Sequence, residues 1–267
     1  MNATMSLATA LPAALEHNEF VLYYQPLVDL ASGTIRGMEA LARWRHPELG
    51  LLTPDRFIDL AEDTGTIVAL GGRLLELACR KASDWLRLAP SPPFVSVNLS
   101  VRQIRQPGLV ADVAEILHRT ELPPSQLQLE ITESVAMGTD DETLETLRSL
   151  ADSGVRLAID DFGTGYSNLA YLRALPVHAL KLAGGFVQGL RSPHKPDPTD
   201  EAIVTTLVSL GHTLGLTITA ESVETASQAD RLHKLGCDLG QGWHFSRPLP
   251  DHRLTRLISD GRVPASA

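Results

Sequence analysis

Hydrophobic positions along the chain fall into short continuous runs and longer stretches with helical spacing. The first two runs, FVLYYQPLVDL at residues 20–30 and TIRGMEALARW at residues 34–44, are rich in β-branched and aromatic residues and predict strands. The letters ASGT that follow the first run predict a tight turn. We therefore expect these two strands to form a hairpin.

Farther along the chain, strand-like runs alternate with segments whose apolar residues recur at helical spacing. The predicted strands span residues 94–100, 127–132, 155–160, 179–184, 216–221 and 237–242. The predicted helices span residues 67–88, 109–120, 141–154, 167–175, 200–215, 226–236 and 251–261. A shorter helix is expected within residues 53–65, with Thr53 as its N-cap and Gly65 as its stop. Residues 1–17 predict a helical lead-in, and the Pro-rich residues 191–200 predict a surface loop.

The order of these elements narrows the fold class. Alternation of strands and helices predicts parallel strands joined by right-handed crossovers. Eight strands in 267 residues favour an α/β fold of the (β/α)8 barrel type, with one domain over residues 1–267 and a core at about 12–262. A doubly wound open sheet is the alternative, but it would normally carry a glycine fingerprint after the first strand, and none is there.

Composition adds limits on location and partners. The formal charge of −9 argues against binding a nucleic acid polymer or an anionic lipid surface. No run of 18 apolar residues is present, so no membrane span is expected, and the N-terminus lacks the basic region of a signal peptide. The two cysteines, Cys79 and Cys237, have no metal-type neighbours and suit a reducing, cytoplasmic location.

Polar residues recur in or at the ends of the predicted strands, where barrel enzymes build their active sites. They are Gln25, Glu39, Asn98, Glu130, Asp160, Asp161, Lys181, Glu221 and Gln241. Five of these are carboxylates, which are costly inside apolar runs unless they are paired or bound to metal. We expect the single lysine to neutralise one carboxylate only, so the pattern predicts divalent metal.

The donor types indicate which metals fit. All candidate ligands are oxygens, which suits Mg²⁺, Mn²⁺ or Ca²⁺ better than zinc or copper. Five carboxylates exceed what one Mg²⁺ usually takes, so two metals sharing Asp160 are predicted, an arrangement typical of phosphate-ester cleavage. Each residue taken alone has a plainer interpretation, as a salt-bridged, solvated or capping side chain. The triplet DFG at residues 161–163 also occurs in kinases, but no other kinase motif accompanies it.

An ordered set of motifs resembles the EAL domain of bacterial cyclic di-GMP phosphodiesterases. The motifs are YYQPLVDL, GMEALARWRHP, VNLSVRQ, LEITES, IDDFGTGYSNLAYL, AESVET and QGWHFSRPLP, and they cover the chain from about residue 12 to residue 250. The resemblance implies a modified TIM barrel whose first strand is antiparallel. It also implies metal-dependent hydrolysis of cyclic di-GMP, a second messenger in bacterial signalling, to linear pGpG.

The resemblance further implies a role for each matching residue. The first metal, Mg²⁺ or Mn²⁺, would be held by Glu39, Asn98, Glu130 and Asp160, and the second by Asp160, Asp161 and Glu221, with Ca²⁺ acting as an inhibitor. Catalysis would involve Asp160, Glu221, Lys181 and Gln241, with Lys181 positioning the attacking water. Gln25, Leu41 and Arg43 would contact substrate, and Glu133 and Glu224 would hold the DFGTGYS loop near the metals.

Two positions depart from the family pattern. Ala183 stands where an aspartate normally follows the lysine, and Ser222 stands where glycine is common. The missing aspartate leaves an alternative open, in which the chain is a cyclic di-GMP receptor with little or no turnover. The resemblance also implies a homodimer and, outside this chain, possible sensory or cyclase domains.

Overall fold

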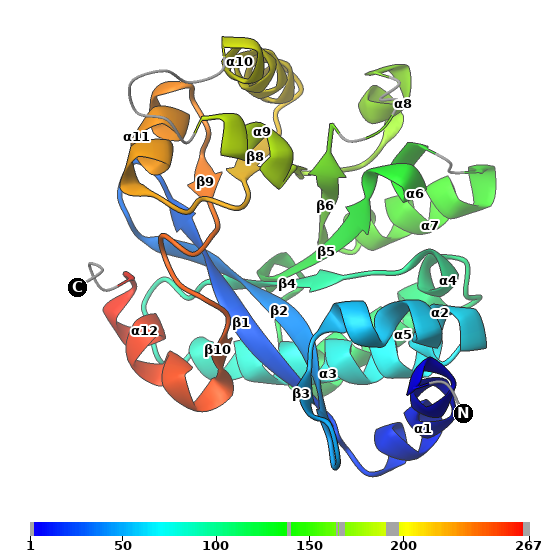
Figure 1. Cartoon of the computed structure of the whole chain (residues 1–267). Helices are drawn as coiled ribbons and strands as arrows, with labels where there is room; N and C mark the ends of the chain where they lie inside the picture. The colour runs from blue at the N-terminus through cyan, green and yellow to red at the C-terminus, as the bar shows by residue number, and fades with distance from the viewer. Residues whose placement is uncertain (1–2, 138–139, 164, 166–168, 191–197, 264–267) are drawn as a thin grey trace.

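A computed structural model describes residues 3–137, 140–163, 165, 169–190 and 198–263. Within these residues, eight strands close into a barrel with helices arranged around it (Figure 1). The barrel strands are β1 (Phe20–Asp29), β2 (Ile35–His46), β4 (Phe94–Asn98), β5 (Leu127–Thr132), β6 (Arg156–Phe162), β7 (Ala179–Leu182), β8 (Thr217–Ala220) and β9 (Leu239–Gly240). The short strands β3 (Gly50–Leu52) and β10 (Leu249–Pro250) pair with β2 and β1.

The first strand distinguishes this barrel from a regular (β/α)8 barrel. Strand β1 pairs antiparallel with β2 on one side and with β9 on the other, whereas the remaining neighbours in the barrel are parallel. Hydrogen bonds run along nearly the whole hairpin, from Phe20 opposite Trp44 to Val28 opposite Ile35. The predicted hairpin and the modified barrel are therefore confirmed, and the open-sheet alternative is excluded.

A helix overlaps each predicted helical segment, and three further short helices lie at residues 101–104, 133–137 and 184–189, where none was predicted. The helices are α1 (Ala3–Glu16), α2 (Ile58–Thr64), α3 (Ile67–Trp85), α4 (Val101–Ile104), α5 (Leu109–Thr120), α6 (Glu133–Met137), α7 (Asp141–Asp152), α8 (Leu169–Ala174), α9 (Gly184–Gly189), α10 (Pro198–Thr213), α11 (Ala226–Lys234) and α12 (Leu254–Asp260). None of these described helices has both the length and the apolar character needed to cross a membrane.

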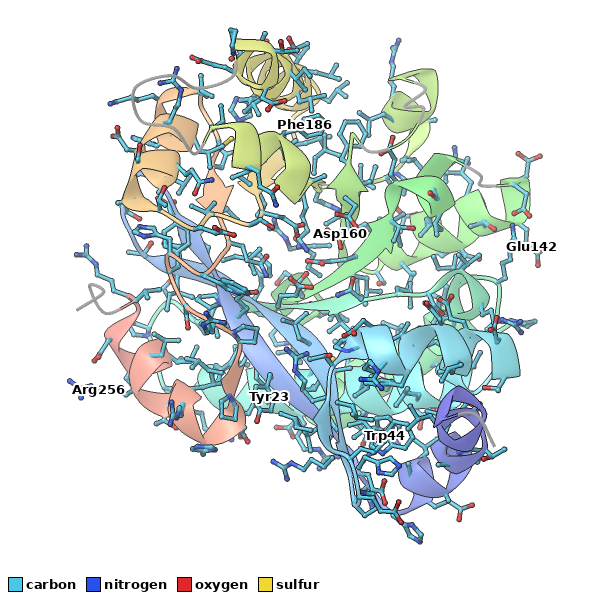
Figure 2. All side chains as sticks on the ribbon, viewed as in Figure 1. Tyr23, Trp44, Glu142, Asp160, Phe186 and Arg256 are labelled. Carbon is cyan, nitrogen blue, oxygen red and sulfur yellow. The ribbon has the colours of Figure 1, made fainter. Side chains whose placement is uncertain are left out.

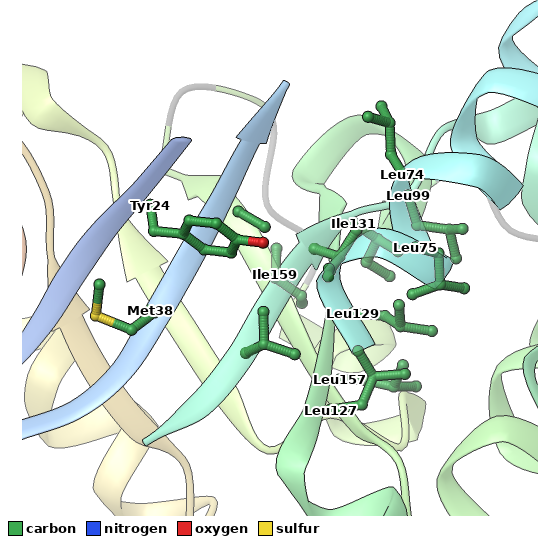
Figure 3. Packing of buried hydrophobic residues seen from close by; sticks show 14 of the residues in the cluster. Tyr24, Met38, Leu74, Leu75, Leu99, Leu127, Leu129, Ile131, Leu157 and Ile159 are labelled. Atoms are coloured by element: carbon green, nitrogen blue, oxygen red, sulfur yellow. The ribbon is translucent and has the colours of Figure 1, made fainter. Parts of the chain in front are cut away.

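The core lies between the strands and the surrounding helices. In β5, Leu127, Leu129 and Ile131 are fully buried, and they pack in one cluster with Leu75 of α3 (Figure 3). Because side chains alternate along a strand, the intervening residue Glu130 faces the barrel interior. This alternation keeps one face of the strand apolar and leaves the other free for polar groups.

Several predicted boundaries are wrong. Strand β7 ends at Leu182 instead of residue 184, because helix α9 begins there with Ala183 as its N-cap residue. Thr53 precedes a short 3-10 turn and makes no capping hydrogen bond, whereas Gly65 does end α2 in the left-handed conformation. The predicted loop at 191–200 lies outside the described residues up to 197, and Pro198 already begins α10.

Candidate active site

The polar strand residues meet at one end of the barrel because neighbouring strands place them in register. Asn98 of β4 pairs with Glu130 of β5, and Gln25 of β1 pairs with Glu39 of β2. Asp160 lies near the centre of the barrel among side chains that project inward (Figure 2). Residues far apart in the sequence therefore share one pocket.

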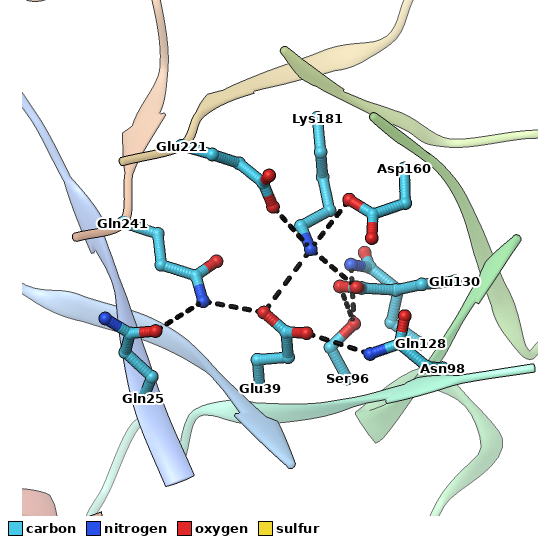
Figure 4. Close-up of polar contacts among 10 residues, drawn as sticks. All are labelled: Gln25, Glu39, Ser96, Asn98, Gln128, Glu130, Asp160, Lys181, Glu221 and Gln241. Carbon is cyan, nitrogen blue, oxygen red and sulfur yellow. Dashed lines mark hydrogen bonds and ion pairs between the residues drawn. The ribbon is translucent and has the colours of Figure 1, made fainter. Parts of the chain in front are cut away.

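Lys181 of β7 forms the centre of this cluster, with a side chain that is 1% exposed (Figure 4). Its ammonium Nζ lies 2.6 Å from a carboxylate oxygen of Glu130, 2.7 Å from Glu221, 3.0 Å from Asp160 and 3.3 Å from Glu39. These carboxylates come from four different strands or strand ends. Lys181 thus contacts four carboxylates, but its single positive charge can offset only one of their four negative charges.

Amide side chains orient Glu39 from both sides. Asn98 Nδ2 donates to Glu39 Oε1 at 2.9 Å, and Gln241 Nε2 donates to Glu39 Oε2 at 2.6 Å. Gln241 also donates to Gln25 Oε1 at 3.2 Å, and Gln25 donates in turn to the Ser246 carbonyl at 2.9 Å. The network holds the carboxylate in one orientation and ties it to the loop after β9.

Two residues that the sequence did not single out hold Glu130. Ser96 Oγ donates to Glu130 Oε1 at 2.5 Å, and Gln128 Nε2 donates to Ser96 Oγ at 3.0 Å. All three side chains are at most 2% exposed. A signal was present in the alternation of the strands, since Ser96 and Gln128 lie two residues before Asn98 and Glu130 and so share their faces.

Asp160 and Asp161 both line the pocket although they are neighbours in one strand. Regular alternation would send them to opposite faces, but the pairing of β6 with β7 shifts register between Ile159 and Phe162. Asp161 has a φ of +52°, a left-handed conformation uncommon outside glycine. Burial, followed by the charge of Asp160, raises the pKa of Asp161.

The site is electrostatically strained without metal. Burial is the main reason that the pKa values of Glu130 and Glu221 rise to about 8, and the nearby Asp160 and Glu39 add to the shift. Burial opposes the charge of Lys181, but its carboxylate partners raise its pKa well above the usual value. Lys181 is therefore a cation and a hydrogen-bond donor at neutral pH in this arrangement.

The oxygen donors of the acidic cluster determine which metals suit the site. Among the described residues, no group of three or more His, Cys, Asp or Glu side chains is arranged to hold a metal ion. Four of the acids instead surround the Lys181 ammonium. Gln241 Oε1 is buried but accepts no hydrogen bond from the described residues, and Asp160 Oδ1 faces the Lys181 ammonium at 3.0 Å without a hydrogen bond. Clustered carboxylate and amide oxygens with spare acceptor capacity suit hard divalent cations.

Two hollows adjoin the cluster, and both are lined in part by Glu39 and Asp160. The first, of about 330 Å³, also contains Gln25, Asp161, Glu221, Glu224 and Gln241. The second, of about 470 Å³, contains Leu41, Asn98 and Glu130. Arg43, the other predicted substrate residue, lies outside both linings, where its guanidinium is 5.4 Å from the Tyr23 ring and donates to the Ala42 carbonyl at 2.7 Å.

Glu133 contacts the loop that follows β6, whereas Glu224 lines the smaller hollow. Glu133 is 3% exposed, and its Oε2 accepts from the backbone nitrogens of Gly163 at 2.9 Å and Gly165 at 3.1 Å. Thr164 and residues 166–168 of the loop lie outside the described residues. Glu224 lines the smaller hollow, and its backbone nitrogen donates to Gln228.

Comparison with known proteins agrees with this architecture. A family model described as EAL domain matches residues 8–248. The uncharacterized protein Rv1357c of Mycobacterium tuberculosis is 45% identical over 94% of this chain and 82% of that protein. The bifunctional diguanylate cyclase/cyclic di-GMP phosphodiesterase MucR of Pseudomonas aeruginosa is 46% identical over 96% of this chain, which spans 37% of MucR.

Solved structures give the same result. The structure of the PaMucR phosphodiesterase in its c-di-GMP complex matches with a TM-score of 0.88 and 46% identity, covering 93% of this chain and 99% of that chain. The EAL domain of Mycobacterium smegmatis DcpA matches with a TM-score of 0.77 and 35% identity, covering 92% and 100%. A modified α/β barrel with a carboxylate-lined pocket thus defines the class, and the chain belongs to the EAL domain family.

Proposed function

We propose that this chain hydrolyses cyclic di-GMP to linear pGpG with the help of two divalent metal ions, Mg²⁺ or Mn²⁺. The observation that carries the proposal is the convergence of Glu39, Glu130, Asp160 and Glu221 on one buried ammonium. The similarity to MucR, which is named as a cyclic di-GMP phosphodiesterase, supports the choice of substrate.

The residues that would hold the metals are Glu39, Asn98, Glu130, Asp160, Asp161 and Glu221. Bound metal would neutralise charge on the phosphodiester and make water a stronger nucleophile. Lys181 would keep its proton and donate hydrogen bonds within the acidic cluster. Gln241 and Asn98 would keep Glu39 oriented, as their hydrogen bonds do in the structure.

Substrate would be bound along the two hollows beside the carboxylates. Gln25 and Leu41 line one hollow each and would contact it on the two sides of the cluster. Arg43 would have to leave its contact with Tyr23 to reach a phosphate. Glu133 would keep the loop at Gly163 near the acidic cluster through its two backbone hydrogen bonds.

Hydrolysis is tested by incubating the protein with cyclic di-GMP in Mn²⁺, Mg²⁺, Ca²⁺ or EDTA and separating the products. We expect pGpG in Mn²⁺ and Mg²⁺ and no product in Ca²⁺ or EDTA, because Ca²⁺ prefers longer and looser coordination. Tight binding in Mn²⁺ without turnover over hours would instead support the receptor alternative. Ala183 favours that alternative, because it stands two residues after Lys181, where the family normally has an aspartate.

The domain bounds, oligomeric state and location of the protein are further predictions. A single domain over residues 1–267, a homodimer, a cytoplasmic location and companion sensory or cyclase domains in a longer protein remain predictions. Size-exclusion chromatography with light scattering, with and without cyclic di-GMP, measures the oligomeric state directly.

A further inference from the structure

A hollow with charged walls, the basal hollow, lies at the opposite end of the barrel from the acidic cluster. Its volume is about 390 Å³, and its lining includes Asp29, Arg36, Phe94, Arg156 and Thr217. Arg156 and Thr217 are the first residues of β6 and β8, and Asp29 is the last residue of the antiparallel β1. The basal hollow therefore lies where the parallel strands begin, and it shares no lining residue with the two hollows beside the carboxylates.

One wall of the basal hollow is an arginine stacked on an aromatic ring. Phe94 begins β4 opposite Gly37 of β2, and a Cβ on Gly37 would collide with the Phe94 ring. The glycine therefore lets the ring lie against the backbone of β2. The Arg156 guanidinium carbon lies 5.0 Å from the centre of the ring, within the range of a cation–π contact. The ring thus holds the guanidinium of Arg156 beside the hollow.

The two arginines of the basal hollow have no anionic partner in the part of the chain that the structure describes. The side chains of Arg36 and Arg156 form no ion pair or hydrogen bond there, and the Nε of Arg156 is buried without an acceptor. Burial, followed by the charge of Arg36, lowers the pKa of Arg156. The two guanidinium groups are therefore close enough to repel each other, and an anion in contact with both would relieve this repulsion.

The two carboxylates in the lining are held by other groups. Asp29 Oδ1 accepts from the backbone nitrogen of Ser32 at 2.8 Å and from its hydroxyl at 2.9 Å. Burial opposes the charge of Asp29, but these hydrogen bonds and then the charge of Arg36 lower its pKa. Asp238 Oδ2 lies 3.0 Å from Nε2 of His212 and accepts from a backbone nitrogen of β8 at 2.8 Å. Neither carboxylate forms an ion pair with an arginine of the hollow, so both guanidinium groups keep their donors for a ligand.

The donors in the lining indicate the chemistry of that ligand. Ser91, Ser125 and Thr217 add hydroxyl groups to the two guanidinium groups. Several donors around one cavity match a phosphate group, whose oxygens accept paired hydrogen bonds from arginine. A carboxylate has fewer oxygens and would leave more of these donors unpaired. The volume is in the range of small-molecule sites, so a phosphate carried by a nucleoside also has room.

We propose that the basal hollow binds a dianionic phosphate group in contact with Arg36 and Arg156. The ligand is inorganic phosphate or a small molecule that carries a terminal phosphate. Bound there, it would link the starts of β2 and β6, which flank β4 and β5 in the sheet, and so stabilise the barrel. The inference is independent of the proposed hydrolysis, because it uses no residue of the candidate active site.

Calorimetry of the metal-free protein in EDTA, with inorganic phosphate as the probe, tests the proposal. Arg36→Gln and Arg156→Gln are each expected to raise the Kd for phosphate about 10-fold or more, because a charged donor of the site is lost. Arg256→Gln is the matched control, since the Arg256 side chain is 92% exposed on α12 and lies outside the lining of the basal hollow. This control should keep the affinity of the wild type.

Thermal melts give a second readout, because a ligand that binds only the folded protein raises its melting temperature. Phosphate should raise the melting temperature of the wild type and of Arg256→Gln more than potassium chloride of equal ionic strength does. Arg36→Gln should lose this difference. Arg36 is exposed near the start of β2, so this variant tests the site even if Arg156→Gln does not fold. No binding of phosphate to the wild type, or equal affinity in Arg36→Gln, would overturn the proposal.

Guanosine monophosphate and guanosine distinguish the two sources of the phosphate. An affinity for the monophosphate no higher than that for inorganic phosphate identifies the free ion as the ligand. A higher affinity that Arg36→Gln removes, with no binding of guanosine, identifies a nucleotide. Guanosine that binds as tightly as its monophosphate, with Arg36→Gln affecting neither, would mean that the hollow does not recognise phosphate and would overturn the proposal.

Discussion

The Ser222 side chain occupies the space that a Cβ on residue 184 would need. A Cβ built on Gly184 would collide with the Ser222 hydroxyl oxygen and crowd its Cβ. Ser222 also has a φ of +56°, a conformation that glycine adopts more easily. The serine beside Glu221 and the glycine after Ala183 are thus a matched pair, which explains how the chain tolerates its departure at residue 222.

This pairing predicts a coupled effect on stability. Gly184→Ala is expected to lower the free energy of unfolding by about 1 kcal/mol, because the new Cβ crowds the Ser222 side chain at a partly exposed contact. Ser222→Gly should be neutral or slightly stabilising, and the double variant should recover most of the loss. Denaturant unfolding of all four proteins measures the coupling. Additive effects of the two changes would mean that the two side chains do not compete for space.

Ala183→Asp is expected to act in two ways. Since Ala183 is the N-cap residue of α9 and makes no capping hydrogen bond, an aspartate there should cap the helix and add about 1 kcal/mol of stability. A carboxylate two residues after Lys181 should also raise turnover at low Mg²⁺ concentration. Ala183→Asn is the matched control, because it can cap the helix without adding charge.

Thermal melts and the metal dependence of kcat separate these two effects. If Ala183→Asp and Ala183→Asn gain stability alike and neither changes kcat or metal affinity, the missing aspartate has no bearing on catalysis. The site would then have compensated for its loss, and Ala183 would not indicate a receptor.

Glu39→Ala should abolish cyclic di-GMP hydrolysis while preserving the fold. Lys181 would keep three other carboxylates within 3.0 Å, and removing Glu39 relieves repulsion in the metal-free site. We expect the melting temperature in EDTA to hold or rise, whereas the stabilisation by Mn²⁺ should shrink. A variant that unfolds in EDTA would show that Glu39 has a structural role.

The acidic cluster predicts an unusual pH dependence for the metal-free protein. The folded-state pKa values of Glu130 and Glu221 are raised to about 8, so the folded state binds more protons than the unfolded state between their usual values and 8. Stability in EDTA should therefore fall as pH rises from about 5 to about 8. Mn²⁺, which needs deprotonated ligands, should stabilise the protein more at the higher pH.

Melting temperatures across this pH range, with EDTA or Mn²⁺, measure the effect. Glu130→Gln is the control, because it removes one titrating group and should flatten the slope in EDTA. A wild-type melting temperature that rises with pH throughout the range would contradict the assignment of raised pKa values to these glutamates.

Much of this architecture follows from local patterns. Alternation in LQLEIT predicts the bounds of β5 and the inward side chain of Glu130, because strand geometry repeats every two residues. The turn letters ASGT predict the hairpin for the same local reason. The acidic and amide residues at the strand ends also identify the candidate site, since parallel strands end at one edge.

Other features depend on contacts between distant segments. Lys181 contacts four carboxylates that come from different strands or strand ends. Ser96 of β4 donates to Glu130 of β5. The Ser222 side chain after β8 takes the space that a Cβ on Gly184 of α9 would need. The end of β7 at Leu182 and the register shift at Asp160 likewise arise from the packing of neighbours. Period and composition, which are properties of the sequence alone, identify the residues that carry the chemistry. Which of their atoms meet depends on the closed barrel, because closure sets the distances between strands that are far apart in the chain.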